Sequence, residues 1–358
     1  MNEPAFKKYL RWLLGSFALA LLVLLVVNWR VDPLQFYRRA SYPAFIIGEK
    51  RFQIPGIAKH YDYDAVILGT SMSENIQAKD VQEIFGWRAL NLAMQGASAR
   101  EQQLALEVAL RTGKPRHVIW DVNWEYLRGS SDWVANYDGS FPFYFYDENS
   151  WNELGNYLLS VDTTKNTAKI LLHRYQSKTP DEVFVWFNQK QFGLESFREG
   201  WRKSAAKRHE RFVQHAAEYD LANLNANFDL RFLAVLRAHP DVEFKLYFPP
   251  FSLAYYADIC VANPQIFSNL LANQQHVIAE CRALTNVQIF DFQTTLPLVR
   301  EATNYCDLAH NSHATMLQCL AAMHAGDSRA TDNSPVELRS LVESSATAAW
   351  LKEVLPSP

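Results

Sequence analysis

Short apolar runs alternate with stretches of helical periodicity in the first half of the chain. The run from Asp64 to Gly69 is continuously apolar after its first residue and closes on glycine, which is typical of a strand buried on both faces of a parallel sheet. The same reading predicts strand 64–69, helix 74–85, strand 88–93, helix 98–111 and strand 117–121. Because these elements alternate with short connections, we expect a central parallel sheet with helices on both faces, that is, a three-layer α/β sandwich.

The alternation breaks after the third strand. Residues 124–222 are rich in Trp, Tyr and Phe and lack a regular rhythm, which predicts a mostly helical insertion over the ligand-binding edge of the sheet. The rhythm then returns as helix 223–238, strand 243–248, helix 264–284, strand 287–291 and helix 312–324. We therefore expect an α/β domain over residues 61–330 and a peripheral helix within residues 331–358.

The amino-terminal region has the pattern of a membrane span. Residues 12–29 are apolar apart from Ser16 and Asn28, and a helix of this length can cross the hydrocarbon layer of about 30 Å. Cations precede the run and tryptophans border it: Lys7, Lys8, Arg11, Trp12 and Trp29. No small-x-small cleavage site follows. We predict a cytoplasmic tail at 1–11, an uncleaved single-pass anchor at 12–29, a linker at 30–60 and a domain outside the cytoplasm. A buried core helix and a cleaved signal peptide are the alternatives.

Charge and cysteine content narrow the possible functions. The net charge is −3, so no overall basic surface supports binding to nucleic acid. The four cysteines lack the Cys-x-x-Cys spacing of zinc or thioredoxin sites. Outside the cytoplasm they could form one or two disulfides, and buried free thiols are the alternative.

Polar residues follow several of the predicted strands. In open parallel sheets, ligands bind at the carboxyl ends of the strands, so these residues are expected to meet at one edge. Ser71 follows the first strand, Gly96 the second and Asn123 the third, whereas Asp307 and His310 follow the last.

The spacing of Asp307 and His310 suggests acid–base chemistry. A carboxylate three residues before a histidine can hold the Nδ1 hydrogen of the imidazole, which leaves Nε2 to take a proton from a hydroxyl. Ser71 could supply that hydroxyl, although a serine between a strand and a helix can also be a simple helix cap.

The segments around these residues resemble the sequence blocks of the SGNH/GDSL hydrolase superfamily. Residues 66–73 resemble the nucleophile block, 91–96 the second block and 307–310 the final block. The resemblance implies a flavodoxin-like fold, Ser71 as nucleophile, His310 as general base and Asp307 as its partner. It also implies an oxyanion hole formed by the N–H groups of Ser71 and Gly96 and the side chain of Asn123.

Two departures point to a subgroup of this superfamily. Thr70 replaces the usual aspartate before the serine, and the sequence Trp-Asp-Val-Asn-Trp at 120–124 replaces the usual Gly-x-Asn-Asp block. These features resemble membrane-anchored SGNH-like proteins of cell-surface polysaccharide O-acetylation. The resemblance implies a bacterial inner-membrane protein with a periplasmic domain, and a multi-spanning membrane acyltransferase as partner. The substrate would be a polysaccharide or another acyl ester.

Other functions compete with this interpretation. An α/β-hydrolase elbow is disfavoured because position 73 is serine and not glycine. A metal site built from Asp307, His310 and His313 lacks a further ligand, so we expect neither a metal nor another cofactor. An inactive glycan-binding or scaffold protein and a lipid esterase remain as alternatives to an O-acetyltransferase or acetylesterase.

Overall fold

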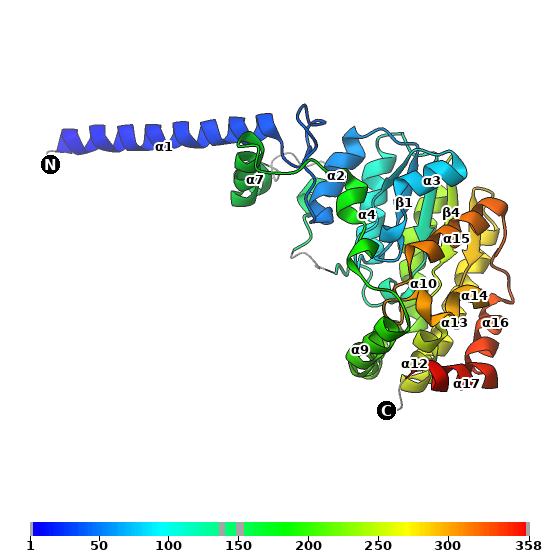
Figure 1. Ribbon diagram of the computed structural model, residues 1–358. Coiled ribbons are helices and arrows are strands. Elements are labelled where there is room, and N and C mark those ends of the chain that lie inside the picture. Colours follow the sequence, from blue (N-terminus) through cyan, green and yellow to red (C-terminus); the bar gives the residue numbers. More distant parts are fainter. Residues whose placement is uncertain (1–2, 136–139, 148–153, 356–358) are drawn as a thin grey trace. The chain divides into compact units, whose positions relative to one another are not determined.

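A computed structural model describes residues 3–135, 140–147 and 154–355 (Figure 1). The chain divides into two compact units, of which the first comprises Met1–Tyr61 and Phe141–Val183 and the second Asp62–Ser140 and Phe184–Pro358. The helices and strands of the second unit are β1 Ala65–Leu68, α3 Ala78–Phe85, β2 Ala89–Asn91, α4 Ala99–Leu110, β3 His117–Asp121, α8 Pro180–Phe184 at the boundary, α9 Leu194–Gln214, α10 Leu221–Phe228, α11 Ala234–Ala238, β4 Glu243–Phe248, α12 Leu253–Ala262, α13 Pro264–Arg282, β5 Val287–Asp291, α14 Leu296–Val299, α15 His313–Ala325, α16 Ser334–Val342 and α17 Ser345–Val354.

The five strands form one parallel sheet in the order β2-β1-β3-β4-β5. This confirms the α/β fold with a central parallel sheet, and the order is that of flavodoxin-like and SGNH-like folds. β1 is buried along its whole length, as its continuous apolar run predicts. Because β1 lies between β2 and β3, the loops that follow these three strands meet at one edge of the sheet.

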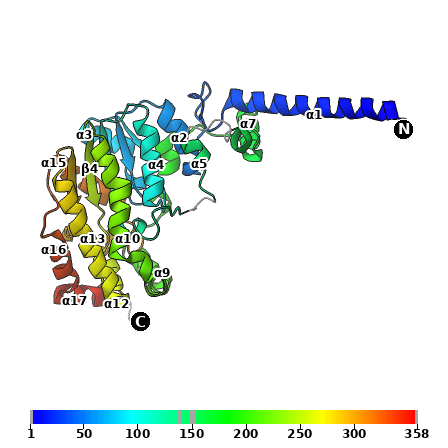
Figure 2. The same cartoon turned by 180° about the vertical axis from the view of Figure 1, so that it is seen from behind.

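Helices cover both faces of the sheet (Figure 2). On one face Trp120 of β3 stacks on Phe232 at 3.9 Å between ring centroids and donates a hydrogen bond to Gln102 of α4. On the other, Ile67 and Ile119 belong to the large buried core that α3 and α15 complete. Alternating side chains of each strand therefore enter two different cores, which is the physical basis of the layered architecture.

Local capping explains where key helices begin. The Ser98 hydroxyl accepts a hydrogen bond from the N–H of Glu101, whose carboxylate accepts one from the N–H of Ser98, and this capping box starts α4. Ser344 likewise accepts from the N–H of Thr347 and starts α17. The single peripheral helix expected within 331–358 is therefore two helices, α16 and α17.

The first unit contains α1 Glu3–Val31, α2 Lys50–His60, α5 Phe143–Tyr146, a π-helical turn at Leu154–Leu158 and α7 Val161–Leu171. The range 30–60, expected as a linker, therefore includes a helix. Asp32 fixes the conformation of the first residues of this range, since its carboxylate accepts hydrogen bonds from the N–H groups of Phe36, Tyr37 and Arg38. It also accepts one from the Tyr157 hydroxyl at 2.7 Å.

Helix α1 contains an exposed apolar stretch, Ala5–Val31, that is long and apolar enough to cross a membrane. By length and composition it suits either a single-pass anchor or a signal sequence. The aromatic-rich range 124–222 is largely helical where the structure describes it, and it contributes to both units. The four cysteines carry free thiols, of which Cys281 and Cys319 are buried.

Candidate active site

The chain turns sharply after β1 because of one glycine and one buried carboxylate. Gly69 has a φ of +134°, and a Cβ there would lie 2.3 Å from the carboxylate of Asp121, so only glycine fits. Asp121 ends the neighbouring strand β3. Its Oδ2 accepts hydrogen bonds from the Thr70 N–H at 2.9 Å, the Thr70 hydroxyl at 3.1 Å and the Ser73 hydroxyl at 2.9 Å. These contacts fix the turn that presents Ser71.

The environment of Asp121 is unusual for a carboxylate. Complete burial raises its pKa to about 6, although the hydrogen bonds from Thr70 and Ser73 favour the charged form. Its second oxygen, Oδ1, is buried without a hydrogen-bond partner in the described part of the chain. The sequence pattern places this residue at the end of a strand but does not indicate this role.

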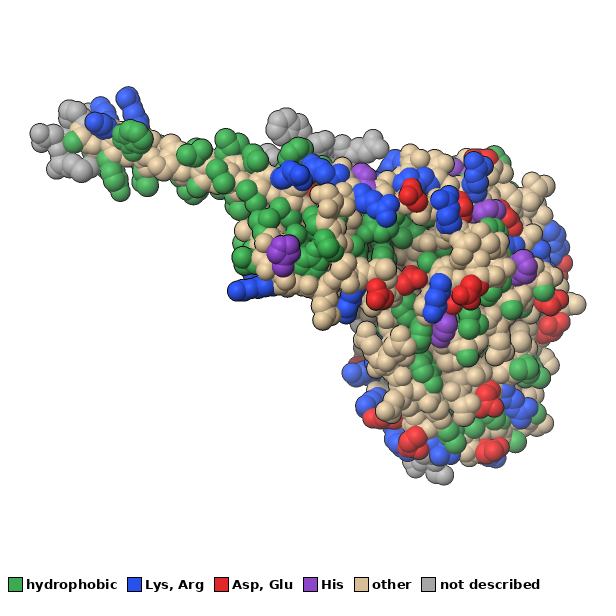
Figure 3. Space-filling view, turned by 45° about the horizontal axis from the view of Figure 1, so that its top comes forward, with side chains coloured by type: hydrophobic (Ala, Val, Ile, Leu, Met, Phe, Trp, Pro, Cys, Tyr) green, Lys and Arg blue, Asp and Glu red, His purple; other side chains and the backbone are tan. Residues whose placement is uncertain are grey.

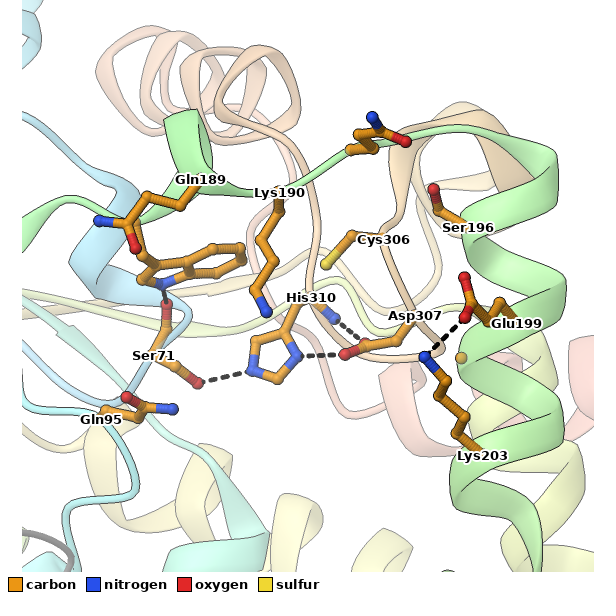
Figure 4. A pocket seen from close by; sticks show the side chains of 13 residues that line it. Ser71, Gln95, Gln189, Lys190, Ser196, Glu199, Lys203, Cys306, Asp307 and His310 are labelled. Carbon is orange, nitrogen blue, oxygen red and sulfur yellow. Dashed lines mark hydrogen bonds and ion pairs between the residues drawn. The ribbon is translucent and has the colours of Figure 1, made fainter.

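Ser71, His310 and Asp307 form a continuous hydrogen-bonded chain (Figure 4). The Ser71 hydroxyl lies 2.9 Å from Nε2 of His310, and Nδ1 of His310 lies 2.7 Å from Oδ2 of Asp307. Asp307 Oδ1 accepts hydrogen bonds from the N–H groups of Ala309 and His310, each at 2.8 Å, so the carboxylate is held from two sides. The structure thus brings together the three residues predicted as a triad.

The pKa values of this pair are strongly coupled. Burial alone raises the pKa of Asp307, but the His310 imidazolium and the hydrogen bonds to Asp307 lower it below its ordinary range. Burial alone lowers the pKa of His310, but the Asp307 carboxylate outweighs burial and raises it, with a smaller contribution from Glu74. The pair therefore favours a charged carboxylate that stabilises a proton on the imidazole, as a general base requires after proton transfer.

Trp186 is a site residue that the sequence did not indicate. Its indole Nε1–H donates a hydrogen bond to the Ser71 carbonyl at 2.9 Å, and its ring meets that of His310 edge to face at 5.3 Å. One side chain thus contacts both the Ser71 backbone and the His310 ring. The aromatic-rich insertion contains many similar residues, so composition alone gave no reason to choose this one.

Of the three residues predicted for the oxyanion hole, Ser71 follows β1, Gly96 lies in the loop after β2 and Asn123 in the loop after β3. Gly96 is buried and is the third residue of a turn closed by the Ala97 N–H and the Met94 carbonyl at 3.0 Å. Its φ of +64° explains the glycine. The Asn123 amide lies 3.4 Å from the Thr70 hydroxyl, next to the Ser71 turn.

Two cavities open from the Ser71 and His310 pair. The larger has a volume of about 600 Å³, and most of the side chains that line it carry polar groups: Gln95, Trp186, Gln189, Lys190, Gln191, Ser196, Glu199 and Lys203. The smaller has a volume of about 240 Å³, and its wall combines Met72, Asn123, Tyr126, Phe251 and Tyr255 with Glu125 and Arg211. A ligand bound in either cavity would reach the same hydroxyl.

Helix α9 forms one wall of the larger cavity and contacts Asp307 closely. A Cβ at Gly200 would lie 2.6 Å from both Cα and Cβ of Asp307, so this glycine permits the approach. Cys306 also lines the cavity, but burial raises the pKa of its thiol to about 12, which disfavours the reactive thiolate.

His313, considered above as a possible metal ligand, and Arg211 both have carboxylate partners. His313 Nε2 lies 2.6 Å from Asp80 Oδ2, and its ring stacks on Phe187 at 4.5 Å. Arg211 of α9 donates a hydrogen bond to Glu125 at 3.1 Å. His313 therefore connects α15 to α3, and Arg211 contributes to the wall of the smaller cavity.

All of these site residues belong to the second unit, around the carboxyl ends of β1, β2 and β3. The fold places them where flavodoxin-like sheets bind ligands. No protein-family model matches the sequence, and a comparison with curated proteins finds no significant match.

Proposed function

We propose that this protein is a membrane-anchored, SGNH-type serine enzyme that transfers or hydrolyses acyl esters. The observation that carries the proposal is the chain of hydrogen bonds from the Ser71 hydroxyl through His310 to Asp307. Metal ions and organic cofactors have no part in the proposed reaction.

The proposed reaction is a double displacement. As Ser71 Oγ attacks the ester carbonyl, its proton moves to Nε2 of His310, and Asp307 stabilises the imidazolium. The tetrahedral intermediate collapses when its carbon–oxygen bond to the leaving alkoxide breaks, and His310 returns the proton to that alkoxide. An acceptor hydroxyl or water then attacks the acyl-serine by the same steps in reverse. The N–H groups of Ser71 and Gly96 and the Asn123 amide would stabilise the oxyanion.

The two cavities suit different parts of the substrates, the larger one the polysaccharide and the smaller one the acyl group. Amide and ammonium groups in the larger cavity can hydrogen-bond to the many hydroxyls of a polysaccharide. The smaller cavity has room for an acyl group such as acetyl beside Ser71. We therefore favour an O-acetyltransferase or acetylesterase that acts on a cell-surface polysaccharide, with a multi-spanning membrane acyltransferase as the partner that supplies the acyl group.

The enzymatic proposal is tested with a fluorophosphonate probe and an activated acetyl ester. The full-length protein in detergent should be labelled at Ser71 and should release acetate, whereas Ser71→Ala should lose on the order of 10⁴ to 10⁶ in turnover. Ser345→Ala is the matched control, because this serine is exposed on α17 and belongs to neither cavity wall. Equal acetate release by wild type and Ser71→Ala would refute the assignment.

The same experiment separates the competing functions. The altered block at 120–124 and the aromatic-rich insertion favour, as a second candidate, an inactive SGNH-like protein that binds glycans or acts as a scaffold. Such a protein should retain oligosaccharide binding without probe labelling. Turnover on phospholipid esters that exceeds turnover on acetylated oligosaccharides would instead indicate a lipid esterase.

Helix α1 supports an inner-membrane location with the α/β domain in the periplasm. An uncleaved anchor predicts that the protein resists alkaline extraction of the membrane and keeps residues 1–11. A shortened mature chain that extraction releases would show that α1 is a signal sequence.

A further inference from the structure

Helix α7 has two contrasting faces. Thr163, Thr167 and Ile170 are buried. Val161, Ala168 and Leu172 recur at i, i+7 and i+11, on the opposite side of the helix. Val161 is 67% and Leu172 60% exposed, and the adjacent Leu171 is 56% exposed. A soluble protein rarely exposes so many large apolar side chains on one short helix.

Contacts within the first unit fix the position of α7 along α1. Asn28, in the last turns of α1, donates hydrogen bonds to the Leu158 carbonyl at 2.7 Å and to the Thr164 hydroxyl at 3.1 Å. The neighbouring Trp29 is 46% exposed and is the aromatic residue expected at a membrane interface. If α1 crosses a membrane, α7 therefore lies at the depth where hydrocarbon meets headgroups.

Basic residues surround the apolar surface of α7. The segment from Val161 to Lys178 contains Lys165, Lys169, Arg174 and Lys178 against the single acid Asp162, which gives a net charge of +3 with His173 neutral. Both members of the ion pair between Lys165 and Asp162 are solvent-exposed, and such pairs are weak. Lys165 can therefore exchange this partner for another anion. Figure 3 shows hydrophobic side chains along α1 and on the adjoining part of the same unit, with cationic side chains nearby.

A cavity at the carboxyl end of α1 adds to this surface. It has a volume of about 380 Å³, and Arg30 and His173 line it together with Tyr42, Tyr175, Ile170 and Leu171. Arg38, whose Nη1 donates to the Trp29 carbonyl at 2.6 Å, places another cation at the same helix end. A mixture of cationic, aromatic and aliphatic groups fits a phospholipid at the boundary between headgroup and acyl chain.

We propose that α7 and the loop to Lys178 form a second membrane contact, which seats in the interfacial layer of the bilayer beside α1 and binds anionic phospholipid headgroups. The exposed apolar side chains of α7 continue the exposed apolar surface of α1, and the lysines complement the lipid phosphates. The surface holds the first unit against the membrane, where the anchor alone would leave it free to tilt. This inference rests on the membrane anchoring proposed above and is independent of the ester chemistry.

The test uses nitroxide spin labels on the full-length protein in vesicles of equal parts phosphatidylcholine and phosphatidylglycerol. Three single labels are compared, at Leu172→Cys on α7, at Leu19→Cys within α1 and at Val261→Cys on α12, each combined with Cys260→Ser and Cys306→Ser. Leu19 is 61% and Val261 81% exposed, so all three labels have room. A label in the lipid is accessible to dissolved oxygen, whereas a label in water is accessible to a water-soluble nickel chelate.

We expect the ratio of oxygen to nickel accessibility to be several-fold higher at 172 than at 261. A high ratio at 19 with a water-like ratio at 172 would overturn the second contact and leave the anchor intact. Water-like ratios at both 19 and 172 would overturn the anchor as well. Protection at 172 from both reagents would show that protein covers α7, which would also overturn the proposal. Ser71→Ala should leave all three ratios unchanged, so failure of the enzymatic proposal is distinguishable.

A second comparison tests the preference for anionic lipid. The label at 172 should show a higher ratio with phosphatidylglycerol than in phosphatidylcholine alone, and Lys165→Gln with Lys169→Gln should remove that difference. Equal ratios in the two membranes for the parent protein would overturn headgroup binding.

Discussion

Removing the charge of Asp121 should change how stability depends on pH. Asp121→Asn keeps an oxygen that can accept from the turn after β1 but cannot ionise. Burial raises the pKa of Asp121 from its ordinary value of 3.8 to about 6. At about 1.4 kcal/mol per pH unit, the ionised form destabilises the folded wild type by roughly 3 kcal/mol above pH 6.

The sign follows from proton binding. Between pH 3.8 and about 6 the folded wild type binds the proton more tightly than the unfolded chain, so this residue's contribution to stability falls as pH rises through that window. Asp121→Asn lacks that loss. The free energy of unfolding of the variant, relative to wild type, should therefore increase from pH 4 to pH 6 by up to about 3 kcal/mol and then remain level.

Urea denaturation of the detergent-solubilised protein at a series of pH values measures this difference. Subtracting the wild-type curve cancels the contribution of Asp291, whose pKa burial also raises to about 6. Asp327→Asn, at an exposed position, is the control for the loss of one carboxylate. A difference between Asp121→Asn and wild type that does not change with pH would show that the Asp121 carboxylate is not desolvated and would refute the reasoning.

Three further predictions concern the site. Because the pKa of His310 is raised, kcat/KM should fall with decreasing pH, and the midpoint of this fall should lie above pH 6.5. Asp307→Asn should move that midpoint to lower pH and should lower kcat by about 10² to 10⁴. Trp186→Phe removes the hydrogen bond to the Ser71 carbonyl and should slow fluorophosphonate labelling by about tenfold, whereas Trp87→Phe, far from the site, should leave the rate unchanged. Gly200→Ala should lower kcat, because the new methyl group displaces Asp307. Circular dichroism should show that the helix content is retained, and an unchanged kcat would contradict the contact between Gly200 and Asp307.

The sheet and the three linked side chains could be predicted because each depends on a local pattern. Apolar runs bounded by glycine or proline gave the strands, and parallel topology brings their carboxyl ends to one edge. Asp307 and His310 meet across only three residues, so their pairing needs little knowledge of the rest of the fold.

The remaining site residues depend on tertiary packing that leaves no local signal. Trp186 and Gly200 come from the aromatic-rich insertion, and both act through contacts with distant segments. Helix α12 was also missed, because its residues are apolar on nearly every side and therefore show no helical periodicity. The role of Asp121 required the register between β1 and β3, which fixes the distance from its carboxylate to the turn.

The serine and the imidazole that contacts it come from opposite ends of the sequence, at positions 71 and 310. During synthesis or export, a chain that has emerged only as far as the fourth strand carries the hydroxyl but has no imidazole to activate it. In the proposed reaction, Ser71 therefore gains its base only after position 310 has emerged, when all five strands are available to form the sheet, and an unfinished polypeptide could not carry out that reaction.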